Sequence, residues 1–138
     1  MFTSGNNLEP GYLSRLGREE MSPLEIDQIT SQDKAINSAR PLDAFQASFL
    51  EVKDPDAVLV TWKRAEDGQG TILRFVEVAG KESVIEVQTP LFQVKSAWLN
   101  DALERKQGPL QVLPYGFRFS IKPFQIVTIR LEASANLK

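Results

Sequence analysis

The stretch TWKRAEDGQGTILRFVEVAG, from Thr61 to Gly80, decides the fold of this 138-residue chain. It predicts two β-strands joined by a polar loop that contains Asp67-Gly68, because glycine takes a positive φ without steric cost and Asp-Gly is a strong turn signal. A second stretch, IKPFQIVTIRL from Ile121 to Leu131, predicts a closing strand introduced by a proline. Both stretches indicate short strands separated by tight turns.

Leu24–Thr30 and Phe117–Ile121 alternate apolar and polar residues, which is typical of half-buried strands. The segment 57–62 is nearly continuous in apolar character and predicts a strand that is buried on both faces. Residues 100–106 leave a short helix or turn and an irregular strand as open alternatives, because two helical turns are marginal alone. Further strands are predicted over Leu24–Thr30, Phe45–Val52, Thr71–Val78, Ser83–Thr89, Phe92–Trp98, Phe117–Ile121 and Phe124–Glu132.

The sum is about eight or nine short strands with at most one short helix, which predicts an all-β fold, an antiparallel β-sandwich. Residues 1–22 are polar and rich in turn formers, so we expect a linker or a partly ordered lead-in there. The sandwich domain is expected over residues 23–138. A chain of this length is large enough for one domain with a real core.

The composition excludes several kinds of site. Sixteen basic and 18 acidic residues give a net charge of −2, so there is no global electrostatic reason to expect nucleic acid or an anionic membrane as a partner. Without histidine and cysteine, the chain cannot form a Ser-His-Asp triad, a Cys-His pair or the familiar zinc sites. No apolar run approaches the ~20 residues of a membrane span, and the N-terminus lacks the apolar core of a signal peptide. We therefore expect a cytoplasmic protein that holds no metal.

The carboxylates do not predict a catalytic pair. Glycoside hydrolysis needs two carboxyl groups that flank the scissile bond. Glu66 and Asp67 are adjacent in a loop, where neighbouring side chains usually point apart, and Glu77 lies on the following strand. We expect solvated loop charges and one structural glutamate that pairs with a neighbouring strand, and we predict no catalytic residue in this chain.

Three side chains are candidates for contact with a sugar: Trp62, Arg74 and Trp98. The C–H faces of a pyranose stack on flat aromatic rings, so an exposed tryptophan is the usual platform. Trp62 ends an apolar strand, which favours packing in the core, and Trp98 is expected either in the core or at an interface. No cluster of aromatic residues has the spacing of a binding platform.

A set of landmarks from about Pro23 to Leu131 resembles the C-terminal β-sandwich region of glycoside hydrolase family 38, the zinc-dependent α-mannosidases. Their order and spacing carry the resemblance. In one departure, Gln125 follows the Pro-Phe pair where the family pattern has glutamate, which puts a salt bridge at that position in doubt. The landmarks are Pro23-Leu24, Ser48-Phe49-Leu50, Trp62–Gly68, Leu73–Glu77, Ala79-Gly80, Lys122-Pro123-Phe124 and Ile126-Val127-Thr128.

The resemblance implies a non-catalytic domain that packs against the catalytic domain of an α-mannosidase. In that family the nucleophilic aspartate and the zinc ligands belong to an N-terminal α/β barrel, so the zinc and the activity are expected there and not in this chain. Two alternatives stay open: a stand-alone carbohydrate-binding β-sandwich and a purely structural or interaction domain. A sandwich taken from a larger assembly is also expected to expose a sheet edge and to self-associate through it.

Overall fold

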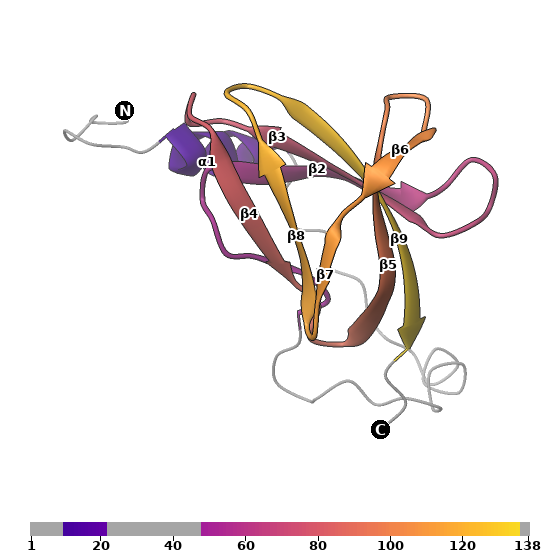
Figure 1. Cartoon of the computed structure of the whole chain (residues 1–138). Helices are drawn as coiled ribbons and strands as arrows, with labels where there is room; N and C mark the ends of the chain where they lie inside the picture. Colours follow the sequence, from indigo (N-terminus) through magenta and orange to yellow (C-terminus); the bar gives the residue numbers. More distant parts are fainter. Residues whose placement is uncertain (1–9, 22–47, 136–138) are drawn as a thin grey trace.

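The computed structural model describes residues 10–21 and 48–135 (Figure 1). Within these residues, nine strands form two antiparallel sheets, which confirms the predicted β-sandwich. The four-stranded sheet has the order β1-β4-β8-β7, and the five-stranded sheet has the order β2-β3-β9-β5-β6. The strands are β1 Glu51–Val52, β2 Ala57–Arg64, β3 Thr71–Glu77, β4 Ser83–Gln88, β5 Phe92–Asn100, β6 Lys106–Pro109, β7 Gln111–Leu113, β8 Gly116–Ile121 and β9 Ile126–Ala135.

The core lies between the two sheets, because alternate residues of each strand point to the same face. Phe75 of β3 and Phe119 of β8 come from opposite sheets, and their ring centroids are 5.0 Å apart. Such aromatic pairs add to the stabilisation that comes from area burial alone. The aliphatic residues packed around these rings are Leu73, Ile85, Val87, Val94, Ile121, Val127, Ile129 and Leu131.

The chain crosses from one sheet to the other three times at the same end of the sandwich, in the loops at residues 53–56, 78–82 and 122–125. These crossings lie at the upper left of Figure 1, away from the β2–β3 loop that projects at the right. The N–H group of Val78 donates to the carbonyl of Asp56 at 2.8 Å, and the N–H group of Glu77 donates to the carbonyl of Gln125 at 3.0 Å. The three crossings are therefore held together by the backbone itself.

Strand β2 corrects one prediction, because it forms an edge of its sheet and is not buried on both faces. Of the residues 57–62, only Ala57 is buried. Trp62, expected in the core, is 47% exposed. A short apolar run predicts a strand but carries no information about how many neighbours that strand has.

The structure also corrects the start of the last strand and decides the open alternative after β5. Strand β9 begins at Ile126 and not at Phe124, because the residues before it form a turn in which the N–H group of Gln125 donates to the carbonyl of Lys122 at 3.0 Å. Residues 101–105 form the turn between β5 and β6, which agrees with the alternative of a short helix or turn and not with an irregular strand. In that turn the N–H group of Glu104 donates to the carbonyl of Asp101 at 3.0 Å.

Helix α1, Pro10–Met21, lies inside the segment that was expected to be a linker, and the sequence did not predict it. Proline suits the first position of a helix, where its missing N–H group has no partner to lose. A helix of 12 residues is marginal alone. It contacts the sandwich, since Nη1 of Arg18 donates to the carbonyl of Leu59 on β2 at 3.1 Å.

The predicted strand Leu24–Thr30 and the first residues of Phe45–Val52 lie outside the described residues, so the domain boundary at residue 23 stays a prediction. In the part of the chain that the structure describes, no helix has the length and apolarity needed to cross a membrane.

Replacing the core residue Phe75 by alanine tests the position of the core. We expect Phe75→Ala to lower the free energy of unfolding by about 3–5 kcal/mol, because Phe75 is fully buried and the cavity cannot close completely. Urea unfolding followed by circular dichroism measures the change. The control is Tyr115→Ala, since the Tyr115 side chain is 76% exposed, and it should change the free energy by less than about 0.5 kcal/mol. Equal losses in both variants would contradict this core.

Candidate functional site

The candidate site is built on Glu77, the last residue of β3. Its side chain is only 1% exposed, yet it carries a charge at neutral pH. The carboxylate accepts four backbone hydrogen bonds: from the N–H groups of Ala79 at 2.8 Å, Gly80 at 2.9 Å, Lys81 at 3.3 Å and Phe124 at 2.7 Å. These five residues are the Glu77 clamp. The hydrogen bonds replace the water that burial removes from the carboxylate.

The Glu77 clamp joins two crossings that are distant in sequence. Ala79, Gly80 and Lys81 lie in the loop between β3 and β4, and their successive N–H groups form the kind of concavity that binds anions. Phe124 lies 47 residues after Glu77, in the loop between β8 and β9. One side chain therefore fixes two of the three crossings at this end of the sandwich.

The hydrogen bonds also decide the charge of Glu77. Burial by itself raises the pKa of a carboxyl group, because it disfavours the charged form. At Glu77 that effect is the largest single one, but the N–H groups of Phe124, Ala79, Lys81 and Gly80 together outweigh it and hold the pKa below its ordinary value. Glu77 is therefore a structural carboxylate and not a proton donor at neutral pH.

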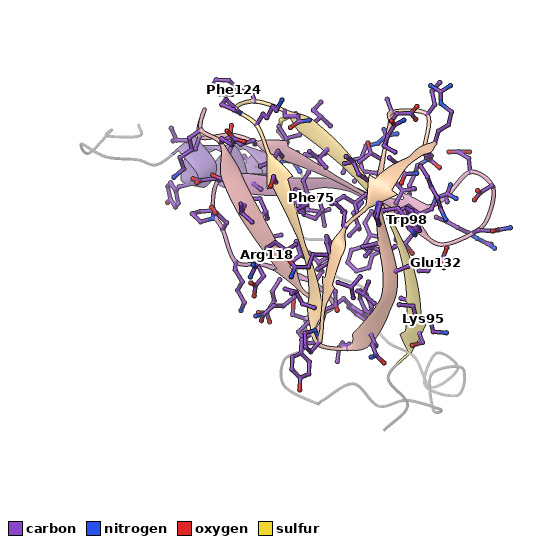
Figure 2. The ribbon with its side chains drawn as sticks, in the orientation of Figure 1. Phe75, Lys95, Trp98, Arg118, Phe124 and Glu132 are labelled. Carbon is purple, nitrogen blue, oxygen red and sulfur yellow. The ribbon has the colours of Figure 1, made fainter. Side chains whose placement is uncertain are left out.

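The Glu77 clamp places one aromatic ring in the solvent. Phe124 has a φ of 56°, a left-handed conformation that a bulky side chain rarely adopts, and its side chain is 72% exposed. The ring lies against Gly80, where an added Cβ would come within 2.8 Å of Cζ of Phe124. Figure 2 shows Phe124 at the outer end of the sandwich, far from Phe75 in the core. The strain of the backbone is offset by the hydrogen bond to Glu77.

Gln125, the position at which the sequence put a salt bridge in doubt, closes its own turn. Oε1 of Gln125 accepts a hydrogen bond from the N–H group of Lys122 at 2.9 Å, and the Gln125 N–H group donates to the carbonyl of Lys122. The side chain closes the turn around Pro123 and Phe124 with a neutral amide. This turn needs no salt bridge at residue 125.

Arg74, one of the sugar-contact candidates, lies on the outer face of the five-stranded sheet, beneath two loops. Its Nη2 donates to the carbonyl of Ala102 at 3.1 Å, and its Nε is buried without a hydrogen-bond partner. The loops above it are joined by four charged residues that we call the charged loop cluster: Lys63, Asp67, Glu104 and Arg130.

Two ion pairs hold the charged loop cluster together. Nζ of Lys63 lies 2.7 Å from Oε1 of Glu104, and Nη1 of Arg130 donates to Oδ2 of Asp67 at 2.7 Å. The hydrogen bond from Lys63 is the main reason that the pKa of Glu104 lies below its ordinary value, and the same contact raises the pKa of Lys63. The N–H group of Gln69, followed by Arg130, lowers the pKa of Asp67. The two loops border an open hollow of about 350 Å³.

The structure does not bring the three sugar-contact candidates together. Trp98 is half-buried, and Nζ of Lys106 lies 4.6 Å from the centre of its ring, which leaves that face occupied. Trp62 lies on the other side of the same sheet, where it meets Phe92 edge-on at 6.4 Å and lines a small cavity of about 140 Å³. Arg74 holds a loop in place. Their role in binding sugar stays a prediction.

The described residues contain no cluster of metal ligands, and their shifted carboxyl pKa values all lie below the ordinary value. No cluster of three or more histidine, cysteine, aspartate or glutamate side chains there could hold a metal ion. Every carboxyl group whose pKa shifts within the described ranges shifts downward. These groups are Asp67, Glu77, Glu86, Asp101 and Glu104.

Sequence reasoning singled out Glu77 as a structural glutamate, and the structure agrees, although its partners are backbone N–H groups and not another strand. It missed Phe124 as an exposed residue, because an apolar residue next to a strand is normally assigned to the strand. Only the preceding Pro123 indicated a turn at this point.

Comparison with known proteins identifies the class of this two-sheet domain. Residues 56–129, more than half of the chain, match the glycosyl hydrolases family 38 C-terminal beta sandwich domain. The chain belongs to this family. No curated protein sequence matches the chain. The matched residues begin in the first crossing and include the whole Glu77 clamp.

The pH dependence of stability tests the ionised state of Glu77. A lowered pKa in the folded state means that ionised Glu77 stabilises the fold above the ordinary carboxyl pKa and that this contribution is lost as the pH falls through the folded pKa. We therefore expect the melting temperature of Glu77→Gln to lie below that of the wild type at pH 7, by roughly 10 °C. The gap should narrow as the pH falls below about 4.

Thermal melting at several pH values between 3 and 7 measures this gap. Glu82→Gln, a change at an exposed residue in the same crossing, is the matched control and should follow the wild type. A gap of constant size across the whole pH range would show that Glu77 does not act through its charge.

Proposed function

We propose that this chain is the non-catalytic C-terminal β-sandwich of an α-mannosidase, and that it supports the catalytic domain that hydrolyses terminal α-mannosides. The family match over residues 56–129 carries the proposal, because it covers the Glu77 clamp and most of both sheets. A domain that is described as the C-terminal part of hydrolases acts together with the remainder of such an enzyme.

The charge state of the carboxyl groups supports the non-catalytic role. A general acid in a glycosidase needs a raised pKa, so that it holds a proton at the working pH. Glu104 and Asp67, the acidic residues of the charged loop cluster, have lowered pKa values and are paired with Lys63 and Arg130. Their geometry suits them to fastening loops.

The alternative of a stand-alone carbohydrate-binding module has no specific observation in its favour. Such a module needs an open aromatic face with polar side chains around it, whereas one face of Trp98 is covered by Lys106. A purely structural or interaction domain differs from the main proposal only in its partner. The experiment below separates the two.

Self-association and location complete the proposal. Strand β2 is an edge of its sheet, but Arg18 of α1 already occupies one of its carbonyl groups, at Leu59, so less of the edge is available for pairing with a second copy. Self-association through this edge stays a prediction.

We place the protein in the cytoplasm because its sequence contains no cysteine for disulfides.

Reconstitution tests the proposed function. The catalytic part of a family 38 α-mannosidase from the same organism, prepared without its C-terminal sandwich, is mixed with this chain. We expect a complex in sedimentation experiments, a higher melting temperature of the catalytic part, and hydrolysis of an activated α-mannoside by the catalytic part only. Hydrolysis by this chain alone would contradict the proposal. The absence of any complex at about 50 μM, a concentration well above the dissociation constants of stable interfaces, would contradict it too.

A further inference from the structure

Two large apolar side chains are exposed at the Glu77 clamp: Phe124, a member of the clamp, at 72%, and Ile126, two residues further on, at 63%. From this pair we infer that Phe124 and Ile126 anchor the domain in an apolar pocket of the α-mannosidase's catalytic part. The inference rests on the proposed function and names the surface through which it operates.

The backbone of Phe124 is fixed although its side chain is exposed. Its N–H group is fixed by Glu77 at 2.7 Å, its φ of 56° sets the direction of the side chain, and Gly80 leaves room for one side of the ring. A core residue is held by its neighbours, but this ring has few. A residue whose backbone is already fixed before binding loses less conformational entropy on binding, and exposed aromatic side chains are enriched among interface hot spots.

Ile126 extends the apolar surface onto the sheet. The register pairs Val58 with Val76 and Val76 with Ile126, so these residues form a row across β2, β3 and β9. Strand alternation turns this row away from the core, because Phe75 and Val127 point inward. The outer face of the four-stranded sheet differs, since Glu86 and Arg118 form an ion pair there at 3.1 Å and face the solvent.

The chemistry around the ring favours a protein over a sugar as the partner. A sugar site surrounds its aromatic platform with polar side chains that bind hydroxyl groups. Here the surface continues from Ile126 into the β-branched row of Val76 and Val58, and the amide of Gln125 is used within its own turn. A pocket lined with apolar side chains is the complementary surface.

The catalytic part fits this surface better than a second copy of the chain. The family is described as a C-terminal domain, so other parts of the enzyme precede it. Helix α1, which precedes the sandwich in the chain, meets β2 at Leu59, one residue from the row of Val58, Val76 and Ile126. A second copy of the chain is the other possible occupant, and the test below distinguishes the two.

The test measures the affinity of four forms of this chain for the catalytic part of a family 38 α-mannosidase from the same organism, by titration calorimetry. We expect Phe124→Ala and Ile126→Ser each to weaken binding, Phe124→Ala by about 30-fold or more. Tyr115→Ala removes an equally exposed ring between β7 and β8 and should bind like the wild type. Urea unfolding of each variant shows whether it is folded, and Ile126→Ser leaves the turn at Phe124 unchanged.

Each outcome decides a separate point. Wild-type binding that neither Phe124→Ala nor Ile126→Ser weakens would overturn this inference and leave the proposed function intact. No binding by the wild type would overturn both. A dimer of the free chain that Phe124→Ala dissociates would also overturn the inference, because the partner would then be a second copy. A shift of the Phe124 amide signal on addition of α-mannosides, without protein binding, would assign the ring to a sugar.

Discussion

The buried carboxylate of Glu77 is the interaction on which this end of the sandwich depends. A charge with 1% exposure is stable only where hydrogen bonds replace its water, and the four N–H groups that do so come from two separate crossings. The two sheets are joined by hydrophobic packing, which sets their distance but not the paths of the loops. The carboxylate fixes the paths of the two loops, because each of its hydrogen bonds holds a particular backbone group in place.

The same constraint connects structure to function. A loop that carries an exposed phenylalanine would normally be mobile, since the ring contributes no burial to hold it. Here the left-handed backbone of Phe124 and the small residue Gly80 are both stabilised through Glu77, so the Cα–Cβ bond of Phe124 points in one direction and the ring lies against Gly80. At the other end of the molecule, the ion pairs of the charged loop cluster fasten two loops. The exposed apolar side chain of Leu103 lies at the tip of one of these loops.

The sequence predicted the fold class and most strands, because period-2 alternation and Asp-Gly turns act locally. Phe117, Phe119 and Ile121 alternate clearly, and all three are buried. The edge position of β2 could not be predicted, since an apolar run has the same composition whether one or two strands flank it. Helix α1 was missed because its residues are polar and turn-rich, and part of its stability comes from contact with β2.

The candidate site was predictable only in part. Glu77 could be assigned a structural role, because a lone carboxylate among β-forming residues has no catalytic partner nearby in sequence. Its real partners are N–H groups, which every residue carries, so no pattern of side chains indicates them. The exposure of Phe124 depends on a contact across 47 residues and on a positive φ, neither of which the local sequence specifies.

Amide hydrogen exchange at the Glu77 clamp tests the central claim most directly. In the wild type, the N–H groups of Ala79, Gly80 and Phe124 should exchange slowly, although all three lie in loops, because the buried carboxylate accepts their hydrogen bonds. In Glu77→Ala they should lose protection together, in both crossings, while the amides of Phe75 and Ile129 in the core stay protected. Rapid exchange of these loop amides in the wild type, or their independent behaviour in Glu77→Ala, would contradict the account.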